Sequence, residues 1–207
     1  MKQFYFILLF FISLIAFSQS PEDLKHDALS KFREGNKKIE QQDYQGAITV
    51  YTAAIKLNPQ LKGAYKNRGI CHSLLKHHKE ALIDFNSAVK LDSIDSDLFS
   101  YRGFTHAELN QFDLAKKDLQ KAIKLNPHNT EALLNTGVVY LWLEEYDRAI
   151  VEFDKIIKIN SSHARAYYNR GIAYEKKGEV AQACFDWGKA KRMNYPLAGI
   201  MNEQFCE

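Results

Sequence analysis

Few side chains in this sequence are spaced for bond chemistry. There is no glycine-rich phosphate loop, nucleophile elbow, His-Glu-x-x-His motif or Cys-x-x-Cys pair. His77-His78 and Glu144-Glu145 are adjacent pairs, but both fall in segments typical of turns, where we expect solvated side chains. His72 and His106 lack evident further ligands for a metal ion. We therefore expect no enzyme activity, no metal site, no cofactor and no small-molecule substrate.

The composition excludes other classes of protein. The 207 residues include 28 Lys and Arg against 25 Asp and Glu, a formal charge of +3. That balance argues against a nucleic-acid binder, which needs a concentrated basic face. Hydrophobic residues make up 46% and charged residues 26%, values of a folded chain rather than a disordered one. Three cysteines are too few for a disulfide framework.

The first eighteen residues have the pattern of a signal peptide. Met1-Lys2 is a short basic start, the run from Phe4 to Phe17 is apolar apart from Ser13, and Ala16-Phe17-Ser18 supplies small residues for cleavage after Ser18. The alternative is an uncleaved anchor, but a helix over the run reaches only ~21 Å of a ~30 Å hydrocarbon core. We expect residues 1–18 to be removed and the protein to be periplasmic or secreted, with membrane contact only during export.

The rest of the chain is an internal repeat with a period of 34. Four columns keep this step over five copies: a glycine, an alanine, a large apolar residue and a second, mostly alanine, position. The columns are Gly35, Gly69, Gly103, Gly137 and Gly171; Ala47, Ala81, Ala115, Ala149 and Ala183; Tyr51, Phe85, Leu119, Phe153 and Trp187; and Ala54, Ala88, Ala122, Ile156 and Ala190.

Each copy has the pattern of two amphipathic helices. Tyr65, Gly69 and His72 are spaced by four and three residues, which places them on one helical face. A glycine in mid-helix costs ~1 kcal/mol relative to alanine, so five in register indicate a structural gain. We expect a neighbouring helix to approach so closely that any Cβ would collide with it. Asn58-Pro59 and Asn126-Pro127 end copies, because proline cannot continue the helical ladder.

Both ends look capped, as a one-dimensional stack requires. Residues 19–27 contain Ser20-Pro21-Glu22-Asp23, a helix start with a hydroxyl cap and early acids. Near the C-terminus, an apolar stripe predicts a closing helix and tail over residues 198–207 that covers the fifth copy. The stripe consists of Leu197, Ile200, Met201 and Phe205.

The repeat resembles the tetratricopeptide repeat family, which has the same period and a similar pattern of aromatic, glycine and alanine positions. The fifth copy carries the pattern in Tyr167, Gly171, Tyr174, Ala183, Trp187 and Ala190, with Pro196 displaced by one residue. Arg68, Arg102 and Arg170 replace the usual leucine before the glycine. The resemblance implies an all-α, right-handed superhelical solenoid with a C-terminal capping helix. Its five repeats would span 28–61, 62–95, 96–129, 130–163 and 164–197.

The resemblance also implies a function: a non-catalytic protein–protein interaction module that binds a peptide or partner helix in a concave groove lined by the first helices. Apolar side chains around Trp142 would supply affinity, and Lys66, Glu131 and Arg165 would set orientation. The groove positions carried over from the family are Lys66, Ile70, Phe104, Glu131, Leu134, Val138, Trp142, Arg165, Tyr168 and Ile172, with Ser100 beside them.

Two alternatives stay open at this point. In the first alternative, neighbouring repeats bury much of the groove surface. In the second, the chain is a structural scaffold or a self-associating component of a cell-envelope complex, and the self-associating form would be a homo-oligomer. The clamp of Lys, Asn and Arg side chains with which some family members hold a terminal carboxylate is absent, because Asp97 and Glu131 stand at two of its positions.

The repeat scheme also indicates which cysteines lie close enough to form a disulfide. Cys71 and Cys184 lie three copies apart, too distant for a disulfide in a rigid stack, so Cys71 is expected as a small apolar residue. Cys206, on the closing helix, is within reach of Cys184. Whether the two pair is left open by the sequence.

Overall fold

The computed structural model describes residues 20–206, which form eleven helices and no strand. The predicted signal peptide, 1–18, lies outside the described residues. The helices are α2 (Pro21–Glu40), α3 (Tyr44–Leu57), α4 (Lys62–Leu74), α5 (His78–Leu91), α6 (Ser96–Glu108), α7 (Phe112–Leu125), α8 (Thr130–Trp142), α9 (Tyr146–Ile159), α10 (Ala164–Lys176), α11 (Val180–Arg192) and α12 (Pro196–Cys206).

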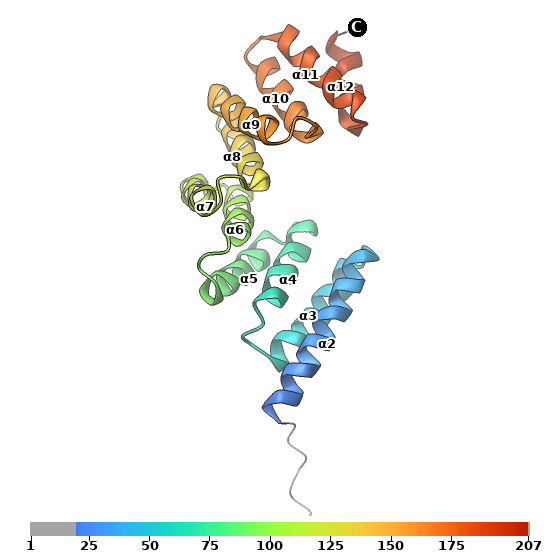
Figure 1. Ribbon diagram of the computed structural model, residues 1–207, viewed down its shortest axis with the longest axis vertical. Helices are drawn as coiled ribbons and strands as arrows, with labels where there is room; N and C mark the ends of the chain where they lie inside the picture. Colours follow the sequence, from blue (N-terminus) through green and yellow to red (C-terminus); the bar gives the residue numbers. More distant parts are fainter. Residues whose placement is uncertain (1–19, 207) are drawn as a thin grey trace, which may run out of the picture.

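The helices stack as antiparallel pairs along one axis, so that the two ends of the described chain lie at opposite ends of an elongated molecule (Figure 1). Within the pairs α2 packs on α3, α4 on α5, α6 on α7, α8 on α9 and α10 on α11. Successive first helices, such as α6 and α8, also contact each other. This all-helical solenoid is the architecture that the period of 34 predicts.

The glycine column is where the two helices of a pair meet. A Cβ built on Gly171 would lie 2.5 Å from the Trp187 ring, and one on Gly69 would lie 2.8 Å from the Phe85 ring. A Cβ on Gly137 would overlap Phe153. Gly103 faces Leu119 instead and has slightly more room, with the nearest atom at 3.0 Å. The predicted close approach is confirmed, and the partner is the large residue sixteen positions later in the same repeat.

The turns inside the repeats share a backbone feature that the sequence does not announce. Two positions after the last residue of every first helix lies a residue with φ between 58° and 81°, and four of these five residues are not glycine. Their amides and those that follow close the helix end, as when Gln42 N–H donates to Ile39 O at 2.8 Å and Asp43 N–H to Lys38 O at 2.9 Å. The five are Gln42, Lys76, Asn110, Glu144 and Gly178.

The three arginines that replace the family's leucine form ion pairs with buried aspartates on the second helix of the same repeat. Each guanidinium donates to both carboxylate oxygens, at 2.6–2.9 Å. A third bond from each arginine reaches the second helix of the preceding repeat, at Thr52, Asn86 or Asp154. The arginines therefore join neighbouring repeats. The pairs are Arg68–Asp84, Arg102–Asp118 and Arg170–Asp186.

The N-terminal start is confirmed and merges with the first repeat. Ser20 caps α2 in a capping box with Asp23, and the helix continues without interruption to Glu40. The predicted stripe on the closing helix is wrong for Leu197 and Ile200, which are 49% and 60% exposed. Ala198 is the fully buried residue of α12, since the small side chain lets the helix sit close to the fifth repeat.

A disulfide ties α12 to the last repeat. Cys184 and Cys206 are bonded with their Cα atoms 5.6 Å apart, and the Phe205 ring lies 5.5 Å from Trp187. Cys71 is a free, fully buried thiol. Across residues 20–206, no helix is both long and apolar enough to cross a bilayer.

Candidate partner-binding site

A cavity of about 400 Å³ opens where α8 and α10 lie side by side. Three of the predicted groove residues line it: Val138, Trp142 and Ile172. The full lining is Val138, Leu141, Trp142, Glu144, Tyr146, Asn169, Ile172 and Lys176. The walls are mostly apolar, with one acidic and one basic side chain at the same cavity, a combination suited to a peptide rather than to a bare ion.

Trp142 is the large hydrophobic residue that is exposed at this cavity. It is the last residue of α8, and 45% of its surface is exposed. Phe104 lies on α6, the first helix of the preceding repeat, and its ring centroid is 5.7 Å from that of Trp142. The backbone behind Trp142 is fixed, because Leu143 N–H donates to Val139 O at 3.1 Å and Glu144 turns the chain. Two aromatic rings on consecutive first helices thus form a positioned apolar surface.

Tyr168 belongs to the neighbouring edge of the solenoid. Its ring lies 4.9 Å from Tyr195, and its backbone oxygen accepts a hydrogen bond from the Trp187 indole at 3.2 Å. Burial, followed by the nearby Tyr195, raises the pKa of Tyr168 above its ordinary value. Tyr168 is part of the support between the fifth repeat and its cap, outside the residues that line the cavity.

The predicted charged residues pair with each other or with nearby acids. Arg165 and Glu131, which occupy the same position in successive repeats, are 3.5 Å apart, and Lys66 lies 3.9 Å from Asp95. The Arg165–Glu131 pair is exposed and contributes roughly 0–1 kcal/mol to stability, so a partner's charges can replace it at little cost.

Leu134 is not on the groove surface, and the expectation for it is wrong. Its side chain is fully buried, because it belongs to the core cluster that α8 forms with residues of α9 and α10, such as Phe153 and Ala173. Ser100 is buried as well and accepts a hydrogen bond from Asn135 at 3.1 Å. Ile70 is half-buried and packs against the cluster around Phe85.

Several lining residues escaped the sequence reasoning, which considered only the groove columns of the first helices. Glu144 sits in the left-handed turn, and Tyr146 begins the second helix. A signal existed for Tyr146, since Tyr44, Phe112 and Tyr146 are aromatic residues in one column. No pattern marked Lys176 or Leu141.

Outside the cavity, the titratable residues are placed for packing. Burial, with smaller effects of the charges around it, lowers the pKa of His72, and burial raises the pKa of the Cys71 thiol to about 11. Within the range 20–206, no three His, Cys, Asp or Glu side chains are grouped so that they could hold a metal ion.

Three models of the tetratricopeptide repeat match this sequence, over residues 32–95, 106–168 and 152–185. The chain belongs to the tetratricopeptide repeat family. Members of this family are generally non-catalytic modules that bind protein or peptide partners, and the matches support a protein-interaction module for this chain.

Solved structures of the family superpose along most of this tetratricopeptide repeat chain. MamA is 28% identical with a TM-score of 0.66, over 80% of this chain and 91% of MamA. YrrB, described as a tetratricopeptide repeat protein with an unusual peptide-binding site, is 26% identical with a TM-score of 0.64, over 91% of this chain and 98% of YrrB. TTC0263 from Thermus thermophilus, 18% identical with a TM-score of 0.74 over 86% of this chain and 97% of that protein, shares the fold.

A shorter match links the chain to a curated protein. Small glutamine-rich tetratricopeptide repeat-containing protein 2 of Saccharomyces cerevisiae is 41% identical over 63 residues. The match covers 30% of this chain and 16% of the yeast protein.

Proposed function

We propose that this chain holds an extended peptide or a helix of a partner protein in the groove around Trp142, by binding without bond chemistry. The observation that carries the proposal is the position of Trp142, 45% exposed beside a cavity of about 400 Å³ and in ring contact with Phe104. An apolar residue of the partner would enter the cavity between Val138 and Ile172, and the Trp142 ring would cover it. Glu144 and Lys176 at the same cavity would fix the direction of the bound segment.

The protein acts outside the cytoplasm in this proposal, in the periplasm or as a secreted protein. Two features support that location: the apolar run from Phe4 to Phe17 and the Cys184–Cys206 disulfide. Disulfides persist mainly in oxidising compartments. Cell fractionation with mass spectrometry of the intact protein tests it. We expect a mature chain that begins at Gln19 in the exported fraction, and a cytoplasmic chain that retains Met1 would overturn the proposal.

A second candidate is self-association through the C-terminal end. Leu197 and Ile200 are exposed on α12, where a second copy could cover them. Size-exclusion chromatography with light scattering separates the two candidates. A dimer that persists in Trp142→Ala and disappears in Leu197→Ser/Ile200→Ser favours self-association, whereas a monomer in every variant favours the groove.

Fluorescence provides the direct test of the groove. Trp187 is fully buried and Trp142 is half-exposed, so Trp187→Phe leaves Trp142 as the only tryptophan. Phenylalanine is already the matching residue in Phe85 and Phe153, which makes this a conservative background. Partners are first captured by crosslinking in the native envelope. We expect their binding segments to shift the emission of Trp142 to shorter wavelength.

The control for this experiment is Ile83→Ala, which removes an exposed apolar side chain from α5, a second helix. Partner binding should survive Ile83→Ala and be lost in Trp142→Ala. If Trp142→Ala bound the captured segment as tightly as the parent, the proposed site would be wrong.

A further inference from the structure

Two cavities on the second-helix side of the solenoid occupy equivalent positions in successive repeats. One, of about 300 Å³, is lined in the fifth repeat by Tyr174, Gln182, Phe185 and Asp186 together with Arg170 and Ala181. The other, of about 350 Å³, is lined in the fourth repeat by Tyr140, Asp147, Arg148, Val151 and Glu152. Each of the latter five precedes its counterpart by one full period of the repeat. The chain therefore contains two versions of one site.

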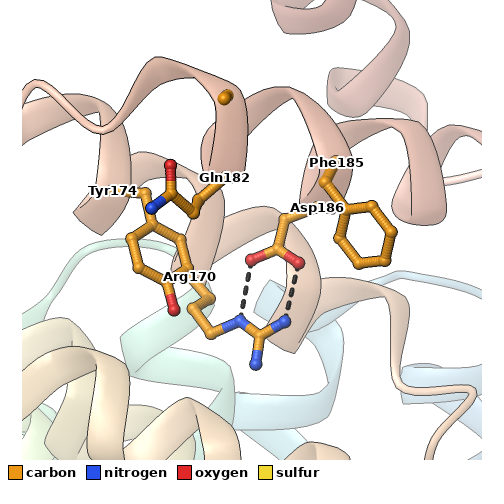
Figure 2. A pocket seen from close by; sticks show the side chains of 6 residues that line it. Arg170, Tyr174, Gln182, Phe185 and Asp186 are labelled. Carbon is orange, nitrogen blue, oxygen red and sulfur yellow. Dashed lines mark hydrogen bonds and ion pairs between the residues drawn. The ribbon is translucent and has the colours of Figure 1, made fainter.

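In the fifth repeat a guanidinium occupies this site, as Figure 2 shows. Arg170 donates to both oxygens of Asp186, each at 2.7 Å, and its guanidinium carbon lies 5.8 Å from the centre of the Tyr174 ring. Burial works against the charged form of Arg170, but its bonds to Asp186 and Asp154 outweigh burial and raise the pKa. The second and third repeats have the same arginine–aspartate pair.

The fourth repeat lacks the arginine. Thr136 stands in its place, and the buried Thr136 hydroxyl donates to Ala132 O at 2.7 Å. Glu152 stands in the place of Asp186, and its side chain is only 12% exposed. One oxygen of Glu152 accepts from Lys155 at 2.7 Å, and the other is buried without any hydrogen-bond partner.

The other charged groups at this cavity have different partners. Arg148 lies over the Tyr140 ring at 5.0 Å, but its guanidinium bonds to Glu145. Asp147 pairs with Lys177 at 2.7 Å. The site thus keeps its tyrosine, over which Arg148 lies, and its carboxylate, with one carboxylate oxygen still to be bonded.

We propose that this fourth-repeat site binds the guanidinium of an arginine side chain supplied by a partner protein. Three repeats of the same chain show which group the carboxylate is placed for, a planar guanidinium that donates to both of its oxygens, and in the fifth repeat this guanidinium also lies near the ring of Tyr174, the counterpart of Tyr140. A buried carboxylate oxygen without a donor is costly, and a guanidinium N–H removes that cost. Val151, 51% exposed at the rim, offers the partner an apolar contact beside the arginine. The site lies on α8 and α9, shares no lining residue with the cavity beside Trp142, and does not depend on the groove.

The test uses the mature chain and N-acetyl-arginine-methylamide as the probe, followed by amide chemical shifts in NMR. We expect saturable shifts at Val151 and Glu152, and binding of N-acetyl-lysine-methylamide roughly tenfold weaker, because an ammonium cannot reproduce the bidentate geometry. Equal binding of the two probes would overturn the proposal.

Two variants and a matched control decide the location. Thr136→Arg supplies the guanidinium from within, as in the other repeats, and should abolish the saturable shifts. Glu152→Gln keeps the shape and should weaken binding roughly tenfold. Asp147→Asn removes an equal charge from the same cavity and should leave binding unchanged. Binding that survives both Thr136→Arg and Glu152→Gln, or that is lost only in Asp147→Asn, would show that the site is elsewhere. If Thr136→Arg did not fold, Glu152→Gln alone would decide.

Discussion

The contact inside each repeat occurs five times with the same chemistry, whereas the groove around Trp142 occurs once. Inside the repeats, a glycine meets a large apolar residue sixteen positions later, and any added carbon would crowd it. At the groove, Trp142 stands where the first three repeats have Glu40, Leu74 and Glu108 and where the fifth has Lys176. The difference teaches that the repeated positions build the solenoid and that the residues departing from the repeat give it a specific surface.

The largest expected effect comes from filling the repeated contact. Gly137→Leu should lower the free energy of unfolding by about 3 kcal/mol or more and the melting temperature by about 6–12 °C, because the Phe153 ring is buried and cannot move aside. Gly103→Leu should cost less, about 1–3 kcal/mol, since its neighbour Leu119 is more adaptable. Circular dichroism melts measure both.

The control for these variants is Gly199→Ala in α12, where nothing lies within 4 Å of the added carbon. It should be neutral or stabilising, since alanine favours a helix. A melting temperature of Gly137→Leu within about one degree of the parent would show that the glycine column has no packing role.

The second largest effect on stability should come from removing the Cys184–Cys206 disulfide. Cys206→Ser opens the link between residues 22 positions apart and should destabilise the docking of α12 by about 3 kcal/mol. Because a repeat array unfolds locally, hydrogen exchange should speed up in α12 and α11 while α2 to α7 keep their rates. Uniformly faster exchange along the whole chain would contradict this account.

At the groove the expected change in stability is smaller. Trp142→Ala removes a ring that is already 45% exposed, so the free energy of unfolding should fall by about 2 kcal/mol, less than the roughly 3–5 kcal/mol of a fully buried tryptophan. Urea titration of the variant measures this. A loss comparable to that of Gly137→Leu would mean that Trp142 belongs to the packing of the repeats and would remove the contrast between the two regions.

The smallest expected effect is a pH dependence of the free energy of unfolding that comes from His72. This residue occupies the position at which the fourth and fifth repeats have Tyr140 and Tyr174. Its pKa is lowered from 6.5 mainly by burial, so the unfolded chain takes up a proton before the folded one does. The free energy of unfolding should therefore fall as the pH drops below 6.5, down to the lowered pKa of the folded state. His72→Tyr should reduce this slope in urea titrations between about pH 7.5 and pH 5.5. An unchanged slope would assign it to other groups.

The repeated positions could be predicted from the sequence, whereas much of what departs from the repeat could not. The glycine and aromatic columns specify the helix pairs, their order and the solenoid, because identical spacing forces identical packing. The left-handed turn residues escaped notice, since Gln42, Lys76 and Glu144 are held there by helix-closing hydrogen bonds rather than by glycine.

The candidate site was predicted only in part. Val138, Trp142 and Ile172 line the cavity as groove positions, but Leu134 is buried. Family positions specify which helix a residue belongs to, whereas its exposure depends on the sizes of its particular neighbours. In the same way, Thr136 is ordinary as a residue type, and its meaning appears only beside the unbonded oxygen of Glu152.

The closing helix also determines how the molecule could grow. Because α12 packs against α11 and the Cys184–Cys206 disulfide holds it there, α12 occupies the place that the first helix of a further repeat would need. A variant lengthened by one more helical hairpin would have to lose both the disulfide of Cys206 and the buried contact of Ala198. The disulfide thus holds α12 against the fifth repeat independently of how well each repeat packs on the next.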